Sequence, residues 1–206
     1  TPDGKSFNPV IAHGIPVMSM AFLLTERSPT IWRGPMVSGA FTQMLRQTNW
    51  GNLDYLVIDL PPGTGDIQLT LSQQVPVNGA VVVTTPQDIA LLDARRGIEM
   101  FRRVEVPVLG VVENMSIHRC SKCGHTEHLF GEDGGDRIAA EYDTELLGAL
   151  PLDLSIRQQT DIGKPTVIND PDGMIAQSYR DIARRTGGRL ALFAERNGSS
   201  GLITKT

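Results

Sequence analysis

The stretch Tyr55-Leu-Val-Ile-Asp59-Leu-Pro-Pro-Gly63-Thr-Gly-Asp66 decides the fold. It opens with an apolar run that ends in an acid, which is typical of a buried strand. Two prolines and two glycines then predict a tight turn. In open α/β sheets, ligands bind just beyond the carboxyl ends of strands, and an acid there can hold Mg²⁺ on a nucleotide phosphate. The residue types alone also leave open a plain turn with an incidental Asp59.

Apolar runs and helical patterns alternate along the rest of the chain. Strands are expected where apolar residues run on without alternation, over 79–84, 106–112 and 146–150. Helices are expected where apolar residues recur on one helical face, over 36–47, 88–103, 138–142 and 175–193. In the helix over 88–103 this face is expected to hold Ile89, Leu92, Ile98 and Phe101. The alternation predicts an α/β fold with a mostly parallel, doubly wound sheet.

Local sequence signals predict the structure of the first residues and the boundaries of some elements. Asp3-Gly4 predicts a hairpin turn, residues 15–20 predict a further strand, and residues 31–34 predict a loop or strand edge between two prolines. Asp88 is expected to cap its helix. No linker divides the chain, so residues 1–196 are expected to form one domain, with 197–206 as a flexible tail.

Composition narrows the classes of function. The 206 residues carry a formal net charge of −4, which disfavours a nucleic-acid partner. No apolar run reaches the roughly 18 residues of a membrane span, so no membrane partner is expected. The chain holds only two cysteines, unlike a disulfide-stapled secreted domain. A cytoplasmic location is therefore expected.

Those two cysteines, Cys120 and Cys123, form a Cys-x-x-Cys pair after the strand predicted over 106–112. A [4Fe–4S] cluster takes four thiolates, and two chains that each donate one pair across a two-fold axis would supply them. Zinc held by the pair with one or both of His125 and His128 is an alternative. A dithiol redox pair and two unliganded thiols also remain open.

The order of motifs resembles the Mrp/ApbC family, within the MinD/ParA/nitrogenase-iron-protein class of P-loop ATPases. The resemblance covers Pro2 to Arg185. Besides the segment 59–66 it rests on Trp32-Arg-Gly-Pro-Met36, Thr85-Pro-Gln-Asp-Ile-Ala90, Val112-Glu-Asn-Met-Ser116, Cys120-x-x-Cys123 and Pro151-Leu-Asp-Leu-Ser-Ile-Arg157. It implies a sheet of the P-loop NTPase type, with ATP and Mg²⁺ as cofactors.

The resemblance also implies roles for single residues. Asp59 would be the Walker B acid and Gly63 the switch amide that senses the γ-phosphate. Asn114 would hydrogen-bond the adenine edge, and Pro151 and Asp153 would line the base and ribose pocket. A side-chain amide suits a base because it offers a donor and an acceptor. From the residues alone, a turn-forming role of Asn114 at a strand end is the favoured interpretation.

The function implied by the resemblance is that of an ATP-dependent iron–sulfur cluster carrier. A homodimer would hold a [4Fe–4S] cluster between two Cys120/Cys123 pairs and transfer it to apoproteins, with an iron–sulfur scaffold as a further partner. Two other classes stay open. One is a non-enzymatic zinc-binding or scaffold module from a decayed P-loop domain, and the other is a MinD/ParA-like positioning ATPase.

A phosphate-binding loop is not found in the sequence. No Gly-x-x-x-x-Gly-Lys-Ser/Thr pattern occurs, and Gly4-Lys5-Ser6 lacks the upstream glycines. The sheet is therefore expected to lack its N-terminal strand and phosphate loop. We expect ATP hydrolysis of the intact protein, and weak or no ATP binding by these 206 residues alone. An incomplete sheet is also expected to expose apolar surface.

Overall fold

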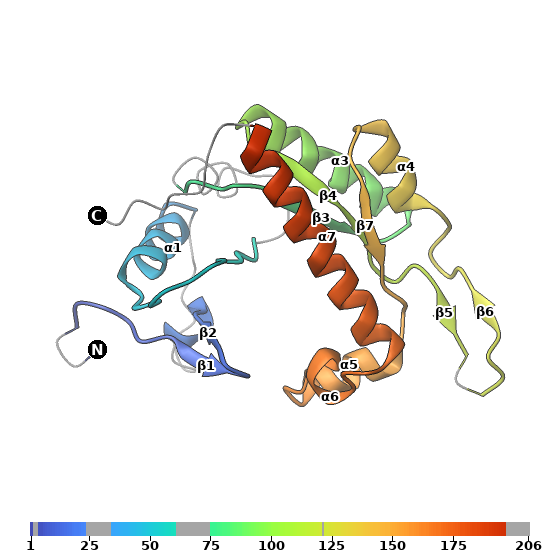
Figure 1. The fold of residues 1–206 in the computed structure, drawn as a ribbon, viewed down its shortest axis with the longest axis horizontal. Coiled ribbons are helices and arrows are strands. Elements are labelled where there is room, and N and C mark those ends of the chain that lie inside the picture. Colours follow the sequence, from blue (N-terminus) through green and yellow to red (C-terminus); the bar gives the residue numbers. More distant parts are fainter. Residues whose placement is uncertain (2–3, 24–33, 61–74, 121, 197–206) are drawn as a thin grey trace. The chain divides into compact units, whose positions relative to one another are not determined.

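The computed structural model describes residues 1, 4–23, 34–60, 75–120 and 122–196 and divides into two units, Thr1–Pro76 and Val77–Thr206. The second unit holds a sheet of three parallel strands in the order β3-β4-β7 (Figure 1). These strands are β3 (Ala80–Thr84), β4 (Val108–Glu113) and β7 (Leu146–Ala149). The strands predicted over 79–84, 106–112 and 146–150 and the parallel α/β fold are confirmed.

Helices connect and cover these strands. The long helix α7 packs against β7 and β4, whereas α3 packs against β3 and α4 against β4. Figure 1 shows α7 lying across the sheet formed by β3, β4 and β7. The helices of this unit are α3 (Asp88–Arg103), α4 (Gly134–Glu141), α5 (Leu154–Asp161), α6 (Thr166–Asn169) and α7 (Met174–Arg196). The predicted helices over 88–103, 138–142 and 175–193 correspond to α3, α4 and α7.

The predicted face of α3 is wrong in part. Ile89 and Leu92 are 74% and 42% exposed, whereas Leu91 and Ile98 are fully buried. The buried positions Leu91, Ala94, Ile98 and Phe101 recur three or four residues apart and form one stripe against the sheet. The cap predicted at Asp88 is also wrong: Asp88 is the first residue of the helix, and the N-cap position is Gln87, whose side chain makes no capping hydrogen bond.

The first unit begins with an antiparallel hairpin. Strands β1 (Val10–Ala12) and β2 (Ile15–Val17) are joined by His13-Gly14, both with positive φ. Paired positive φ values match the right-handed twist of a two-residue hairpin turn. The hairpin predicted at Asp3-Gly4 stays a prediction, because Asp3 lies outside the described residues; the Gly4 N–H donates to the Thr1 carbonyl at 3.0 Å.

The rest of this unit holds the short 3-10 helix η1 (Met20–Leu23) and the helix α1 (Gly34–Gln47). Helix α1 confirms the pattern over 36–47 but begins at Gly34, within the segment expected to be a loop. The strand predicted over 15–20 is confirmed only for its first three residues. Residues 197–206, the predicted tail, lie outside the described residues.

The strand predicted over 55–59 does not form. These residues have no regular secondary structure, and Tyr55 and Val57 are 67% and 91% exposed. A strand exists only through its ladder to a neighbour, and no segment among the described residues pairs with this one. Residues 55–59 therefore have the apolar pattern of a strand but lack, within the described part of the chain, the hydrogen-bonded neighbour that a strand requires.

Candidate functional site

The carboxyl ends of the three parallel strands meet at one edge, which we call the strand-end edge. The Asn114 N–H donates to the Thr84 carbonyl at 2.7 Å, and the Leu150 N–H donates to the Glu113 carbonyl at 2.8 Å. These bonds carry the ladder past the last strand residues. They bring the predicted base-pocket residues Asn114 and Pro151 to neighbouring positions at the edge where α/β sheets bind ligands.

Asn114 uses its side chain in the local backbone. Its Oδ1 accepts a hydrogen bond from the Met115 N–H at 3.0 Å, and Met115 has a φ of 56°. The side chain therefore stabilises a left-handed turn after β4, as a turn-forming residue does. Since the oxygen is engaged there, the Nδ2 group is the end of the amide suited to an acceptor on a nucleotide base.

Asp153 caps α5. Its Oδ1 accepts from the Ser155 N–H at 2.7 Å and from the Ser155 hydroxyl at 2.5 Å. An Asp at this position satisfies one of the amide donors that a helix start leaves unpaired. The structure thus gives Asp153 a local structural role, and its predicted contact with a ribose stays a prediction.

Two further predicted residues belong to the first unit. Asp59 is exposed and lies in the irregular segment that ends at residue 60. Gly63 lies outside the described residues. Their proposed roles with Mg²⁺ and the γ-phosphate therefore stay predictions.

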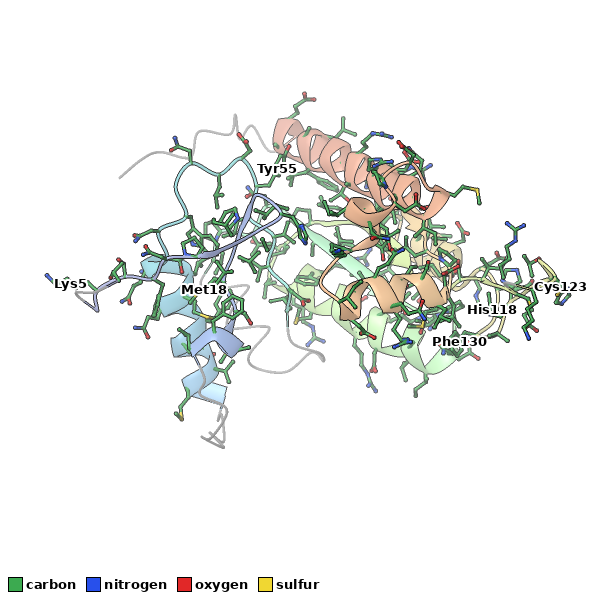
Figure 2. All side chains as sticks on the ribbon, turned by 90° about the horizontal axis from the view of Figure 1, so that it is seen from below. Lys5, Met18, Tyr55, His118, Cys123 and Phe130 are labelled. Carbon is green, nitrogen blue, oxygen red and sulfur yellow. The ribbon has the colours of Figure 1, made fainter. Side chains whose placement is uncertain are left out.

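Cys120 and Cys123 lie on a short antiparallel hairpin, the Cys hairpin (residues 118–127), made of β5 (His118–Arg119) and β6 (Thr126–Glu127). The Cys120 N–H donates to the His125 carbonyl at 2.8 Å, and the Gly124 N–H donates to the Cys120 carbonyl at 2.9 Å. Figure 2 shows Cys123 at the outer end of the hairpin and His118 closer to the body of its unit. Both thiols are free.

Local hydrogen bonds favour the thiolate form of Cys120. The backbone N–H of Cys123, followed by that of Lys122, lowers the pKa of the Cys120 thiol, and the Cys123 side chain adds to this effect. Desolvation and the negative charge of Glu127 oppose it. The thiolate is the form of cysteine that binds iron or zinc, so the backbone N–H groups favour the metal-binding form of Cys120.

Two of the neighbouring histidines lie close to polar groups of the protein. Nδ1 of His118 lies 3.4 Å from Oε1 of Glu127, and Nδ1 of His128 lies 3.1 Å from the Ser116 carbonyl oxygen. In the described part of the chain, no three His, Cys, Asp or Glu side chains gather as a metal site. Cys120 and Cys123 thus form a pair of thiol donors on one turn.

Sequence reasoning missed Glu113, although the residue stands in one of the quoted motifs. Glu113 is only 6% exposed, and its Oε2 accepts a hydrogen bond from the Gly135 N–H at 2.6 Å. It thereby ties the end of β4 to the start of α4. The available signal was an acid at the end of an otherwise apolar strand, where burial requires a partner.

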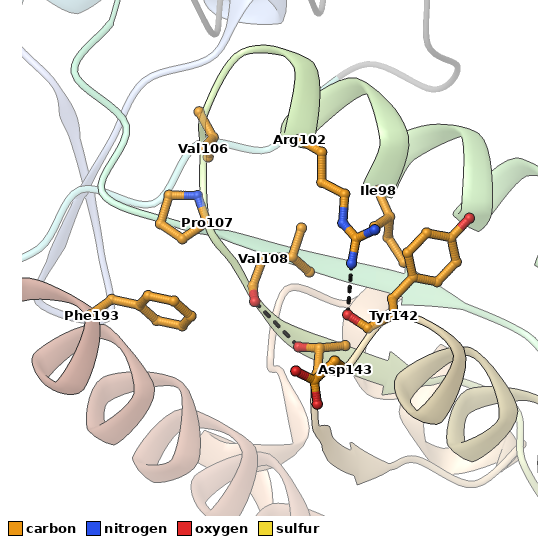
Figure 3. Close-up of a pocket in the computed structure, with 9 residues that line it drawn as sticks. Ile98, Arg102, Val106, Pro107, Val108, Tyr142, Asp143 and Phe193 are labelled. Carbon is orange, nitrogen blue, oxygen red and sulfur yellow. Dashed lines mark hydrogen bonds between the residues drawn. The ribbon is translucent and has the colours of Figure 1, made fainter. Parts of the chain in front are cut away.

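A pocket of about 220 Å³ lies at the opposite end of β4 (Figure 3). Arg102 donates to the Tyr142 carbonyl at 2.8 Å, and its guanidinium lies 4.8 Å from the centre of the Tyr142 ring. Burial and then the charge of Glu99 raise the pKa of Tyr142. No predicted site residue lines this pocket, so it is separate from the strand-end edge.

Comparison with protein families gives a match over most of the chain. The family model described as ParA, NUBPL iron-transfer P-loop NTPase, matches residues 1–186.

None of the helices in the described residues is long and apolar enough to cross a membrane.

Curated relatives are similar over nearly the whole chain. The iron–sulfur cluster carrier protein of Pseudomonas fragi is 63% identical over 91% of this chain and 66% of its own length. That of Escherichia coli K12 is 55% identical over 92% and 52%, and the mouse iron–sulfur cluster transfer protein NUBPL is 53% identical over 88% and 57%. The chain thus spans about half to two-thirds of the length of these relatives.

Solved structures show the same fold. A nucleotide-binding protein of Archaeoglobus fulgidus in complex with ADP has a TM-score of 0.68 and 35% identity, covering 82% of this chain and 65% of its own. The MinD cell division protein of Aquifex aeolicus has a TM-score of 0.52 and 24% identity, covering 78% and 63%. The second likeness bears on the fold alone.

Proposed function

This chain belongs to the ParA family of NUBPL-type iron-transfer P-loop NTPases, and on that premise we propose that it is part of an iron–sulfur cluster carrier. The observation that carries the proposal is the Cys hairpin. It presents Cys120 and Cys123 on one exposed turn, and backbone N–H groups hold the pKa of the Cys120 thiol below its usual value. The curated names of relatives above 50% identity support the same role.

The cargo in this proposal is a [4Fe–4S] cluster held between two copies of the chain. Such a cluster takes four thiolates, and each Cys hairpin offers two. A two-fold axis through the cluster would bring two identical turns together. The exposed position of Cys123 leaves room for a second copy and, later, for an apoprotein client that receives the cluster.

Nucleotide control is the second part of the proposal. Asn114, Pro151 and Asp153 follow two adjacent strands at the strand-end edge, where the base of ATP would lie. Asp59 would hold Mg²⁺, and the Gly63 amide would contact the γ-phosphate. ATP hydrolysis by the full-length protein would then rest on positioning and Mg²⁺ electrostatics. The ADP complex of the Archaeoglobus fulgidus protein supports a nucleotide site in this fold.

Anaerobic reconstitution of the full-length protein with iron and sulfide tests the cargo. We expect a broad absorbance band near roughly 400 nm, about two irons per chain and a doubled mass in solution. Cys120→Ala and Cys123→Ala should each remove the band and the bound iron. A colourless monomer with about one zinc per chain would contradict the carrier proposal.

A further inference from the structure

The first leg of the Cys hairpin is joined to the strand-end edge by backbone and side-chain bonds. Ser116 is only 8% exposed, and its N–H and its hydroxyl both donate to the Leu150 carbonyl, at 3.0 and 3.1 Å. The Leu152 N–H donates to the Ile117 carbonyl at 2.8 Å. The leg that leads to Cys120 is therefore paired with the segment that contains Pro151.

His128 closes the base of the hairpin from the second leg. It follows β6 directly, and its Nδ1 lies 3.1 Å from the Ser116 carbonyl oxygen. Because a carbonyl only accepts hydrogen bonds, Nδ1 must carry the proton in this contact. The other ring nitrogen, Nε2, lies 3.9 Å from Oε1 of Glu132.

The second leg continues to the loop that follows β3. A Cβ atom at Gly134 would lie 2.8 Å from the Cα atom of Pro86, and one at Gly131 would lie 3.5 Å from the Pro86 carbonyl oxygen. Gly134 thus packs closely against Pro86, and Gly131 lies within ordinary contact of it, so the second leg rests on this loop. Both legs thus end on loops of the strand-end edge, and the contact between Ser116 and His128 links them.

We infer that His128 is a positioning residue that couples the strand-end edge to the Cys hairpin. A shift of the segment containing Leu150 and Pro151 would pass through Ser116 to His128, and so reach both legs below Cys120 and Cys123. In the proposed function, on which this role rests, the shift comes from the nucleotide and the hairpin carries the cluster. His128 in this role binds the Ser116 carbonyl through Nδ1, and not iron or zinc.

Two substitutions separate the ring nitrogens. His128→Asn places an amide donor near the position of Nδ1, whereas His128→Gln places one near that of Nε2. In the metal-free, full-length protein, we expect His128→Gln to speed hydrogen exchange of the Cys120 and Gly124 amides roughly fivefold, as loss of one hydrogen bond would. His128→Asn should stay within about twofold of the wild type. Equal exchange in all three proteins would overturn the proposal.

The coupling is measured in the same experiment with MgADP added. MgADP should change the exchange of the Cys120 and Gly124 amides in the wild type and in His128→Asn, and leave them unchanged in His128→Gln. A wild type whose hairpin does not respond to MgADP contradicts the coupling.

Iron content separates this proposal from a ligand role and from the carrier function itself. After reconstitution, His128→Asn should bind as much iron as the wild type, whereas a ligand role for Nε2 would require its loss. Loss of iron in His128→Asn therefore overturns the positioning role. A wild type that takes up no iron sinks the carrier proposal, while the exchange rates of the metal-free protein still decide the role of His128.

Discussion

The Oε2 atom of Glu113, at the end of β4, lies 2.6 Å from the backbone nitrogen of Gly135, in the first turn of α4. The residue that precedes this helix, Asp133, has a φ of 55° and makes no side-chain cap. Glu113 therefore supplies, from a neighbouring strand, the acceptor that a helix start needs. A buried carboxylate is thus used to fix the distance between the central strand and the helix that follows the Cys hairpin.

Substitution of Glu113 tests this cap. Glu113→Ala should lower the free energy of unfolding by about 2 kcal/mol, since it removes a charged acceptor and leaves a buried N–H unpaired. Glu113→Gln keeps an acceptor and should cost about half as much. Urea unfolding followed by circular dichroism measures both. Equal stability of the alanine variant and the wild type would show that the helix start is satisfied in another way.

Two glycines provide a matched test of packing. A Cβ atom at Gly148 in β7 would lie 2.6 Å from Cγ1 of Ile182 in α7, whereas one at Gly188 in α7 would meet nothing within 4 Å. We expect Gly148→Ala to destabilise the protein by about 1–3 kcal/mol through overpacking. Gly188→Ala should stabilise it by about 0.5–1 kcal/mol, because alanine is the better helix former. Midpoints of thermal unfolding that shift in the same direction would contradict this packing.

Asn114→Asp tests the predicted contact with adenine. The substitution keeps an Oδ1 acceptor for the Met115 N–H but replaces the Nδ2 donor with an oxygen. In the full-length protein, calorimetry should show ADP affinity reduced about tenfold, or about 1.4 kcal/mol. The exposed Asn169→Asp is the matched control for the added charge, and its affinity should equal that of the wild type. An unchanged affinity in Asn114→Asp would leave Asn114 with its turn-forming role alone.

The parts of the fold that the sequence predicts well are those whose signal lies in their own residues. Continuous apolar runs give β3, β4 and β7, because strands of a parallel sheet are buried on both faces. The segment 55–59 has the same pattern and forms no strand, since pairing depends on a neighbour that the pattern does not specify. The face of α3 is misassigned for a similar reason: residues on two adjacent stripes are apolar, and only packing selects one.

In the candidate site, too, features encoded in the local sequence are predictable, whereas contacts between distant residues are not. The Cys-x-x-Cys spacing is local and identifies the two thiols directly. The contacts of Glu113 with Gly135 and of Ser116 with Leu150 join residues that are 22 and 34 positions apart. No local sequence pattern predicts which residues these side chains contact. Such contacts follow from the order of the strands in the sheet, which only the folded chain shows.

The pKa of Cys120 provides a test of the turn itself. Hydrogen bonds from the backbone N–H groups of Cys123 and Lys122 lower this pKa, whereas the charge of Glu127 raises it. A lowered pKa means that the reactive thiolate forms at lower pH. The alkylation rate of Cys120 should therefore rise at a lower pH than the alkylation rate of glutathione. The Cys123→Ser variant isolates Cys120 and keeps both backbone donors. Iodoacetamide labelling of this metal-free variant from pH 5 to 10, read by mass spectrometry, gives the profile.

Glu127→Gln, added to the Cys123→Ser variant, fixes the sign of the electrostatic contribution. Removing a negative charge near Cys120 makes its thiolate easier to form, so the alkylation profile should move to still lower pH. Glu132→Gln is the control for the same loss of charge at the second leg, because Glu132 is not among the groups that shift this pKa. Its profile should match that of Cys123→Ser alone. A Glu127→Gln profile that moves to higher pH would mean that Glu127 supports the geometry of the turn more than its charge opposes the thiolate.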